Sequence, residues 1–571
     1  MEINLYGALL LSHLIGNVIF VFVQCDDPLK VCLPDAGCYI GKYMISFDSK
    51  EFGAFLGIPY VFKPYRFQVS KAYTSKKTHD ATKAKCDCKH KNYLAHQKPI
   101  VGSEDCLYLN VYRPTLKYHR PIPVLVHFNG MGFFAGSSNP LLTGPEYIMD
   151  RQDVILVTVS YRLGPFGFLA TSDAKIPGNL GLKDQLVALQ WVYNNVEHFG
   201  GDKFLITLLG QNSGGISAHI HTFSRLSRGF FTGIISISGT ANSIYAIDED
   251  PDYTARQTAK YCNVTNWDTI NTRRLHEALL FMDADTLLNA GDQLKFWSLD
   301  GLAIYRPIVE KDAPDAFLIK NPKWYIVNGE NWPVASMFGI VPNEGAIWAV
   351  NIMENDDLRN DFNSKFLNLT ARMLELPKSL DDEKRLLSTK ILLDNYNLQS
   401  LQLDGNTISN FMQLLSDRAF YYPLYNTIKH YVERIDVVKY PVYFYSFNFK
   451  GEASYAETYA NHPVKRDYNV VHRDDQIYLF RTRFQFPDVK NHSIEAEMIK
   501  LYCRFIVNFA YHRQPTYLQK FRRCNRSTFF IASGTICDYH ELGRGEGNTV
   551  RLAIKNKWST GKMRLFDEII L

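Results

Sequence analysis

A glycine-rich turn between a predicted strand and a predicted helix is the feature that most limits how this chain can fold. Residues 204–209 (FLITLL) form a short apolar run typical of a buried strand, and they lead into Gly210-Gln-Asn-Ser-Gly-Gly215 and then a helical stretch. A strand that turns sharply into a helix crowds its own backbone, which is why the turn needs glycines. Its strained centre pushes one side chain into a pocket. The side chain at that centre is Asn212.

Apolar β-branched runs and helical stretches alternate on both sides of this turn. Short apolar runs of this kind suit parallel strands that are buried on both faces. The alternation therefore predicts an α/β fold with a large central, mostly parallel sheet flanked by helices. Strands are expected at residues 122–128, 154–159, 204–209, 233–237, 333–340 and 441–449, and helices at 182–198 and 493–510.

The composition is that of one large globular unit. The 571 residues are 46% hydrophobic, and no Pro/Ser/Gly tract or fixed repeat divides them, so we expect a single domain over residues 25–571. The net charge is only +5, which gives little reason to expect a nucleic-acid partner. We find no His/Cys/carboxylate cluster with metal-ligand spacing and no phosphate-binding loop, so we predict neither metal nor cofactor.

The N-terminal segment predicts secretion. Residues 5–23 are apolar and polar residues resume at Gln24, which indicates a signal peptide over residues 1–24. The alternative is a retained signal anchor, because this length is close to what spans a bilayer, and only then would the chain be attached to a membrane. The ten cysteines fit an oxidising compartment. Four glycosylation sequons begin at Asn263, Asn368, Asn491 and Asn525.

Several stretches carry a family resemblance, and they occur in that family's order. They are FLGIPY (55–60), EDCLYLNVYRP (104–114), VTVSYRLGPFGFL (157–169), PGNLGLKDQ (177–185), HFGGDKFLITLLG (198–210), PNEG (342–345) and VHRDDQIYLF (471–480). On these motifs the chain resembles the type-B carboxylesterase and cholinesterase family over roughly residues 38–570. The resemblance implies the α/β-hydrolase fold, and the leading segment is most similar to insect esterases such as juvenile hormone esterase.

The resemblance carries the family's catalytic triad onto three positions. The nucleophile falls on Asn212, the acid on Glu344 and the base on His472. An asparagine amide cannot give up a proton to a histidine and attack a carbonyl, so the nucleophile position is vacated. Loss of a triad nucleophile costs roughly a millionfold in turnover in a well-studied protease. We therefore expect a protein that is not a working esterase.

The family's oxyanion hole falls on Gly130, Met131 and Gly132, with a further donor at Ser213. Met131 replaces a glycine of the family pattern, so we expect a strained backbone there and a shifted or partly filled hole. Gln211 replaces the family's glutamate before the nucleophile. Ser213 is either a helix-capping residue or, in an alternative interpretation, a displaced nucleophile.

Other features implied by the resemblance are structural. Cys106 should pair with Cys86 or Cys88 and close a Lys-rich loop at residues 71–91, which we expect to be exposed. Arg66 and Glu104 match a buried ion pair of the family. Pairing stays open for Cys25, Cys32, Cys38, Cys262, Cys503, Cys524 and Cys537.

A non-catalytic binding function is the interpretation that the vacated position favours. The resemblance offers precedent in neuroligin, neurotactin, gliotactin and glutactin. The partner is expected to be a hydrophobic ester-like small molecule, held near Phe133 and Phe134, or an extracellular protein. Two alternatives remain. One is a weak or atypical carboxylic ester hydrolase that uses Ser213 or a water activated by His472. The other is a signal-anchored adhesion protein.

Overall fold

The architecture is an eleven-stranded mixed sheet covered by helices, as the alternating pattern predicts. The computed structural model describes residues 29–93, 98–115, 118–297, 304–515, 538–555 and 561–570. The sheet order is β18 (Val550–Lys555), β17 (Tyr539–Arg544), β16 (Val442–Phe447), β15 (Ala335–Ile340), β14 (Gly233–Ile237), β13 (Gly201–Gln211), β11 (Ile122–Phe128), β12 (Ile155–Val159), β10 (Tyr108–Pro114), β4 (Glu51–Pro59) and β3 (Lys42–Ile45).

The central strands are parallel and the outer ones antiparallel. From β12 through β11 and β13 to β17 every neighbouring pair is parallel, and every residue of β11, β12, β14, β15 and β16 is buried. Strands buried on both faces must be apolar throughout, which is why their sequences read as continuous hydrophobic runs. The predicted fold class is confirmed, and β11 and β14 begin and end at the predicted residues.

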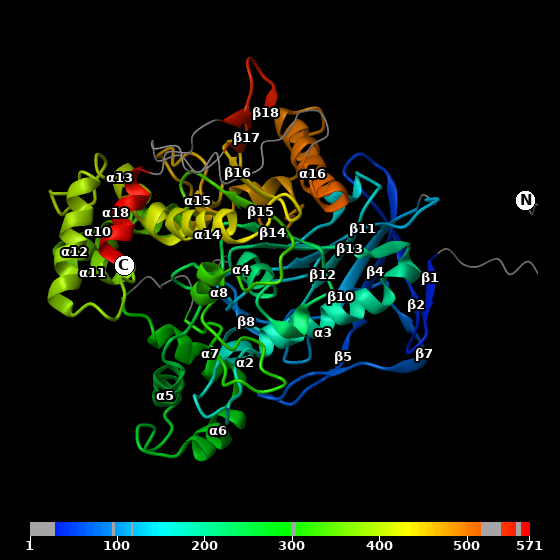
Figure 1. The fold of residues 1–571 in the computed structure, drawn as a ribbon, viewed down its shortest axis with the longest axis horizontal. Helices are drawn as coiled ribbons and strands as arrows, with labels where there is room; N and C mark the ends of the chain where they lie inside the picture. The colour runs from blue at the N-terminus through cyan, green and yellow to red at the C-terminus, as the bar shows by residue number, and fades with distance from the viewer. Residues whose placement is uncertain are drawn as a thin grey trace, which may run out of the picture.

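Helices cover the sheet on both sides. Figure 1 shows α16 above the strands β11 and β13 and α3 below them, with a group of smaller helices at the left of the view, where the C-terminal α18 lies. The helices are α1 (Glu146–Met149), α2 (Gly164–Phe168), α3 (Leu180–Asn195), α4 (Ser213–Ile220), α5 (Pro251–Tyr261), α6 (Thr272–Leu280), α7 (Ala284–Gln293), α8 (Pro322–Asn328), α9 (Ala346–Glu354), α10 (Asp356–Ser364), α11 (Phe366–Met373), α12 (Asp382–Asn395), α13 (Ile408–Ser416), α14 (Tyr422–Arg434), α15 (Tyr455–Ala460), α16 (Ile494–His512) and α18 (Gly561–Ile570).

The Lys-rich segment differs from its prediction as a loop. Its residues 75–80 form strand β7 (Ser75–Asp80), which pairs in parallel with β2 (Ala36–Ile40) beside β1 (Lys30–Leu33). Short pairings involve β5 (Val61–Phe62) with β6 (Lys71–Ala72) and β8 (His90–Lys91) with β9 (Ile100–Val101). The side chains of β7 are mostly exposed, as expected for this segment. Its backbone nevertheless pairs with β2, because backbone hydrogen bonds between strands do not require apolar side chains.

Two disulfides join described cysteines. Cys32 pairs with Cys38 across the β1–β2 hairpin, and Cys88 is the partner of Cys106, which leaves Cys86 as an exposed free thiol. Cys262 and Cys503 are buried free thiols. The predicted signal peptide, Cys25, Cys524, Cys537 and the sequon at Asn525 lie outside the described residues.

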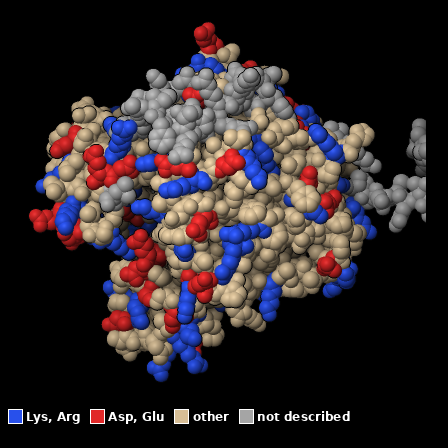
Figure 2. Space-filling view, viewed as in Figure 1, with Lys and Arg blue, Asp and Glu red and all other residues tan. Residues whose placement is uncertain are grey.

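The surface carries both signs of charge. Figure 2 shows Lys and Arg interspersed with Asp and Glu on the face in view. Asn263, Asn368 and Asn491, which begin the three described sequons, are exposed. Across the described part of the chain, no helix combines the length and the apolar character that crossing a membrane requires.

The disulfide assignment predicts unequal effects of two cysteine substitutions. Cys88→Ser should lower the free energy of unfolding by about 3 kcal/mol, because closing a loop of this size removes that much chain entropy from the unfolded state. Cys86→Ser, two residues away, should leave it unchanged. Denaturant titration under non-reducing conditions measures both, and a larger loss in Cys86→Ser would contradict the assignment.

Candidate active site

The turn from β13 into α4 is packed so closely that its geometry is fixed. Asn212 lies at the apex with φ 54° and ψ −122°, a strained backbone conformation outside the regions that residues other than glycine normally adopt. A Cβ added at Gly130 would lie 1.6 Å from the Gln211 carbonyl oxygen, and one at Gly214 would lie 2.1 Å from the Phe128 carbonyl oxygen. Glycine is therefore required at both positions, and the Asn212 side chain is directed at the loop that follows β11.

The Asn212 carboxamide is buried and hydrogen-bonded through both its oxygen and its nitrogen. Its Oδ1 accepts hydrogen bonds from the backbone N–H groups of Gly132 (2.9 Å) and Ser213 (2.8 Å). Its Nδ2 lies 3.1 Å from His472 Nε2, and the residue is only 2% exposed. Because an amide nitrogen can only donate, Nε2 is the acceptor in this contact.

His472 and Glu344 form a buried pair behind Asn212. With Nε2 as acceptor, the ring proton lies on Nδ1, which donates to Glu344 Oε2. The other carboxylate oxygen of Glu344 accepts hydrogen bonds from Ser238 Oγ (2.6 Å) and from the Val341 N–H (3.0 Å). The structure thus brings Asn212, Glu344 and His472 together from three distant segments of the chain.

Gln211 is a member of the site that sequence reasoning did not assign a role. Its Nε2 lies 2.9 Å from His472 Nε2, so two amide groups from adjacent residues donate to one imidazole nitrogen. The signal was present in the sequence, since two consecutive amide side chains occupy the apex of the turn and the position before it.

The predicted strain at Met131 is not found. Positive φ angles fall instead on Gly132 (59°) and Phe133 (62°), so Met131 adopts an ordinary backbone conformation. The Met131 N–H donates to Ser213 Oγ at 3.0 Å rather than pointing into the hole. The backbone donors at Gly132 and Ser213 share one acceptor, the Asn212 oxygen, while the Gly130 carbonyl accepts from Arg473 at 3.2 Å.

Ser213 is neither a cap nor a partner of His472 in this arrangement. Asn212 occupies the N-cap position of α4, and Ser213 is the first helical residue. The interpretation of Ser213 as a capping residue was wrong by one position, because the apex itself provides the side-chain acceptor.

A cleft of about 580 Å³ opens beside the loop at Gly130 and Met131. Gln211 also lines the cleft, whereas the Phe133 ring is fully buried against Phe168, so the expectation that Phe133 lies at a pocket mouth was wrong. The aromatic residues that line the cleft are Phe480, Phe484 and Phe486.

Two buried polar groups at the cleft lack partners among the described residues. They are His127 Nδ1 and Arg473 Nε. Burial, with a smaller contribution from the Arg473 charge, lowers the pKa of His127 to about 3, so this imidazole is neutral at physiological pH. Both atoms are shielded from solvent, so a molecule in the cleft does not contact them in this arrangement.

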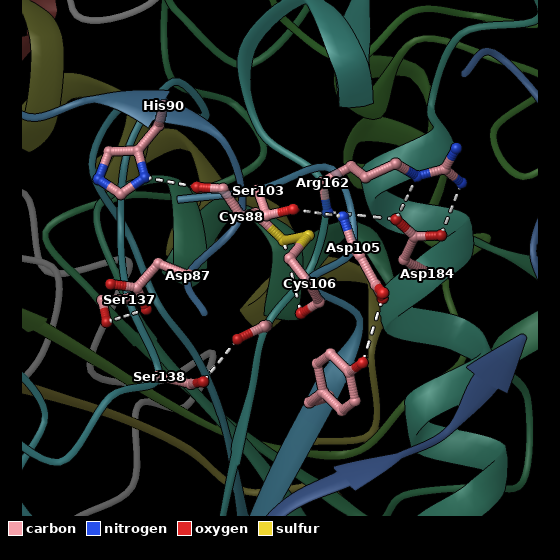
Figure 3. The surroundings of a disulfide bond; sticks show 12 residues. Asp87, Cys88, His90, Ser103, Asp105, Cys106, Ser137, Ser138, Arg162 and Asp184 are labelled. Atoms are coloured by element: carbon pink, nitrogen blue, oxygen red, sulfur yellow. Dashed lines mark hydrogen bonds and ion pairs between the residues drawn. A yellow bond between two sulfur atoms is a disulfide. The ribbon is translucent and has the colours of Figure 1, made fainter. Parts of the chain in front are cut away.

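The loop closed by the Cys88–Cys106 disulfide is hydrogen-bonded to the segment that lines the cleft (Figure 3). Ser137, just after the Gly130–Gly132 segment, donates to Asp87, next to the Cys88–Cys106 bridge. His90 Nδ1 donates to the Cys88 carbonyl at 2.7 Å, and burial lowers the pKa of His90.

Two ion pairs support the scaffold. Arg162 and Asp184 form a buried bidentate pair with both contacts at 2.7 Å (Figure 3). Arg66 and Glu104 pair as expected, at 2.6 and 3.1 Å, although Glu104 is one-third exposed rather than buried. Over the described ranges, no three His, Cys, Asp or Glu side chains are grouped so that they could hold a metal ion.

Comparison with known proteins gives consistent matches over most of the chain. Residues 30–533 match the carboxylesterase family. Juvenile hormone esterase of Tribolium castaneum is 34% identical over 84% of this chain and 83% of its own length, and venom carboxylesterase-6 of Apis mellifera is 30% identical over 83% and 84%. A crystal structure of juvenile hormone esterase from Manduca sexta, with OTFP covalently attached, superposes with a TM-score of 0.80 at 24% identity, covering 95% of this chain and 99% of that one.

The buried contacts of Asn212 predict a large effect of its truncation. Asn212→Ala should lower the free energy of unfolding by about 2–4 kcal/mol, because two buried N–H groups lose their acceptor. Asn469, an exposed asparagine with φ 57°, provides the matched control, since Asn469→Ala imposes a positive φ on alanine at the surface. Equal losses in the two variants, measured by denaturant unfolding, would show that the Asn212 contacts contribute nothing.

Proposed function

This chain belongs to the carboxylesterase family, and from that premise we propose that it is a secreted recognition protein that binds an ester-like molecule without hydrolysing it. The observation that carries the proposal is the double engagement of the Asn212 amide. Its oxygen accepts the two N–H groups that would polarise a substrate carbonyl, and its nitrogen donates to the imidazole atom that would act as base. A substrate ester finds neither a nucleophile nor a free oxyanion hole.

The other hydroxyl in the turn supports the same conclusion. The Ser213 oxygen accepts the Met131 N–H, while His472 Nε2 is contacted by the amides of Gln211 and Asn212. Activation of a serine requires a hydrogen bond from its hydroxyl to the base. Ser213 would have to displace both amides to obtain one.

The cleft supplies the surface for recognition. Phe480, Phe484 and Phe486 offer aromatic contact, and His127 and Arg473 add polar side chains to the wall of the cleft. Ligand sites commonly combine an apolar lining with a few polar groups that fix orientation. An amphipathic molecule with an ester or similar acceptor group fits this chemistry better than a highly charged one.

Secretion rests on several separate features. The chain forms two disulfides within its described part, and three of its sequons are exposed. Disulfides persist in oxidising compartments and are rare in the cytosol. A relative is named as a venom carboxylesterase, which is a secreted setting for the same family.

Restoring the nucleophile should restore turnover. We expect the natural chain to hydrolyse short-chain nitrophenyl esters no faster than Asn212→Ala. Asn212→Ser should exceed both by on the order of 10³-fold or more in kcat/KM, because losing a triad nucleophile costs on the order of 10⁶. Initial-rate assays on the three purified proteins measure this, and efficient hydrolysis by the natural chain would refute the proposal.

Binding should depend on the cleft. Phe484 is 65% exposed at the cleft, so Phe484→Ala should fold normally and weaken binding of an unhydrolysed nitrophenyl ester by about five- to tenfold, the loss of roughly 1 kcal/mol. Phe281, 84% exposed beyond α6, is the matched control, and Phe281→Ala should bind as the natural chain does. Isothermal titration calorimetry that finds the two variants equal would exclude the cleft as the binding site.

A further inference from the structure

We infer that Asn212 is itself a substrate of the site that surrounds it, and that its amide is hydrolysed in the folded protein to give an aspartate at position 212. This inference goes beyond the proposed function and fails separately from it. If the Asn212 amide is never hydrolysed, the proposal that the chain does not hydrolyse esters still stands. If the natural chain does hydrolyse esters, that proposal fails, but the question of whether Asn212 is converted to aspartate is not answered.

The contacts of the carboxamide are those of a bound amide substrate. Its carbonyl oxygen accepts two backbone N–H groups, those of Gly132 at 2.9 Å and Ser213 at 2.8 Å, which is the arrangement that stabilises a developing oxyanion. Its leaving nitrogen lies 3.1 Å from His472 Nε2. His472 is in turn held by Glu344, the arrangement that lets an imidazole take a proton and give it back.

The environment favours the product over the starting amide. The carboxamide lies at the N-terminus of the eight-residue helix α4, where backbone dipoles and unpaired N–H groups stabilise a negative charge. A carboxylate at position 212 would keep both N–H donors as charge-assisted hydrogen bonds. A protonated His472 would then lie between two carboxylates, that of Glu344 and the new one.

The reaction needs only water as co-reactant, and its atoms balance. His472 Nε2 takes a proton from a water molecule whose oxygen forms a bond to Asn212 Cγ, and the negative charge develops on Oδ1 against the two N–H groups. The Cγ–Nδ2 bond then breaks, His472 returns the proton to the leaving nitrogen, and ammonia departs. The new carboxylic acid gives its remaining proton to His472 Nε2, which leaves a carboxylate at position 212 beside an imidazolium. Gln211 lines the cleft and contacts the same Nε2, so a water that enters from the cleft replaces the Gln211 amide and, to be deprotonated, must also take the Nε2 contact of the Asn212 amide.

The competing route to loss of the Asn212 amide nitrogen is cyclisation, in which the next backbone nitrogen attacks the side-chain carbonyl. That route would use the Ser213 nitrogen as nucleophile, but its N–H already donates to Oδ1 and begins helix α4. Direct hydrolysis gives aspartate alone and depends on His472. Cyclisation gives a mixture of aspartate and isoaspartate and does not depend on His472.

Peptide mapping by mass spectrometry of the aged full-length protein tests the inference. The chain contains two further Asn-Ser pairs, Asn242-Ser243 and Asn363-Ser364, which serve as internal controls because they share the Asn-Ser dipeptide. We expect Asn212 to convert at least about tenfold faster than either control, since a single oxyanion donor is worth about 10²–10³ in rate. The product should be aspartate, with one oxygen taken from labelled solvent water.

A variant at His472 separates hydrolysis assisted by the site from the spontaneous deamidation of an Asn-Ser pair. His472→Gln should slow conversion at Asn212 to the rate of the control pairs without changing those pairs. Persistence of the Asn212 amide while the controls convert would overturn the inference. Formation of isoaspartate at an unchanged rate in His472→Gln would overturn it as well.

Discussion

The close approach of three backbone segments around residue 212 is the constraint on which the site depends. A Cβ at Gly214 would lie 2.1 Å from the Phe128 carbonyl oxygen, and one at Gly239 would lie 2.4 Å from the carbonyl oxygen of Asn212 itself. Backbones packed at this distance fix the direction of the Cα–Cβ bond at the apex. Whatever residue stands at 212 is therefore presented to the Gly132 N–H and to His472, and the chemistry of the site follows from that one side chain.

An amide at this position satisfies the surrounding polar groups. It supplies an acceptor to two N–H groups that would otherwise be buried without a partner, and a donor to an imidazole whose other nitrogen is bonded to Glu344. Gln211 adds a second donor to the same imidazole atom. These contacts join the site into one internal hydrogen-bond network, which explains how the scaffold keeps the geometry of an esterase around a residue that cannot form an acyl intermediate. In the function proposed above, the cleft that Gln211 lines is the surface for recognition.

Much of this arrangement could be predicted from the sequence. Continuous apolar runs located the central strands because parallel strands are buried on both faces, and the family resemblance placed Asn212, Glu344 and His472 at one site. The details that failed depend on tertiary contacts. Met131 escapes strain because the positive φ angles fall one and two residues later, at Gly132 and Phe133, and no sequence pattern fixes that register. The sequence also could not show that the Asn212 oxygen occupies the oxyanion hole. That result depends on the orientation of the amide between the backbone N–H donors and His472, which only the three-dimensional structure gives.

Covalent labelling by a fluorophosphonate probe tests the central claim most directly, because such a probe reacts with an activated serine and not with an amide. After incubation of the natural chain and of Asn212→Ser, intact-mass measurement should find the natural chain unmodified and the variant carrying one adduct at residue 212. An adduct on the natural chain that maps to Ser213 would contradict the account, because it would mean that a serine hydroxyl, and not the Asn212 amide, faces His472 in solution.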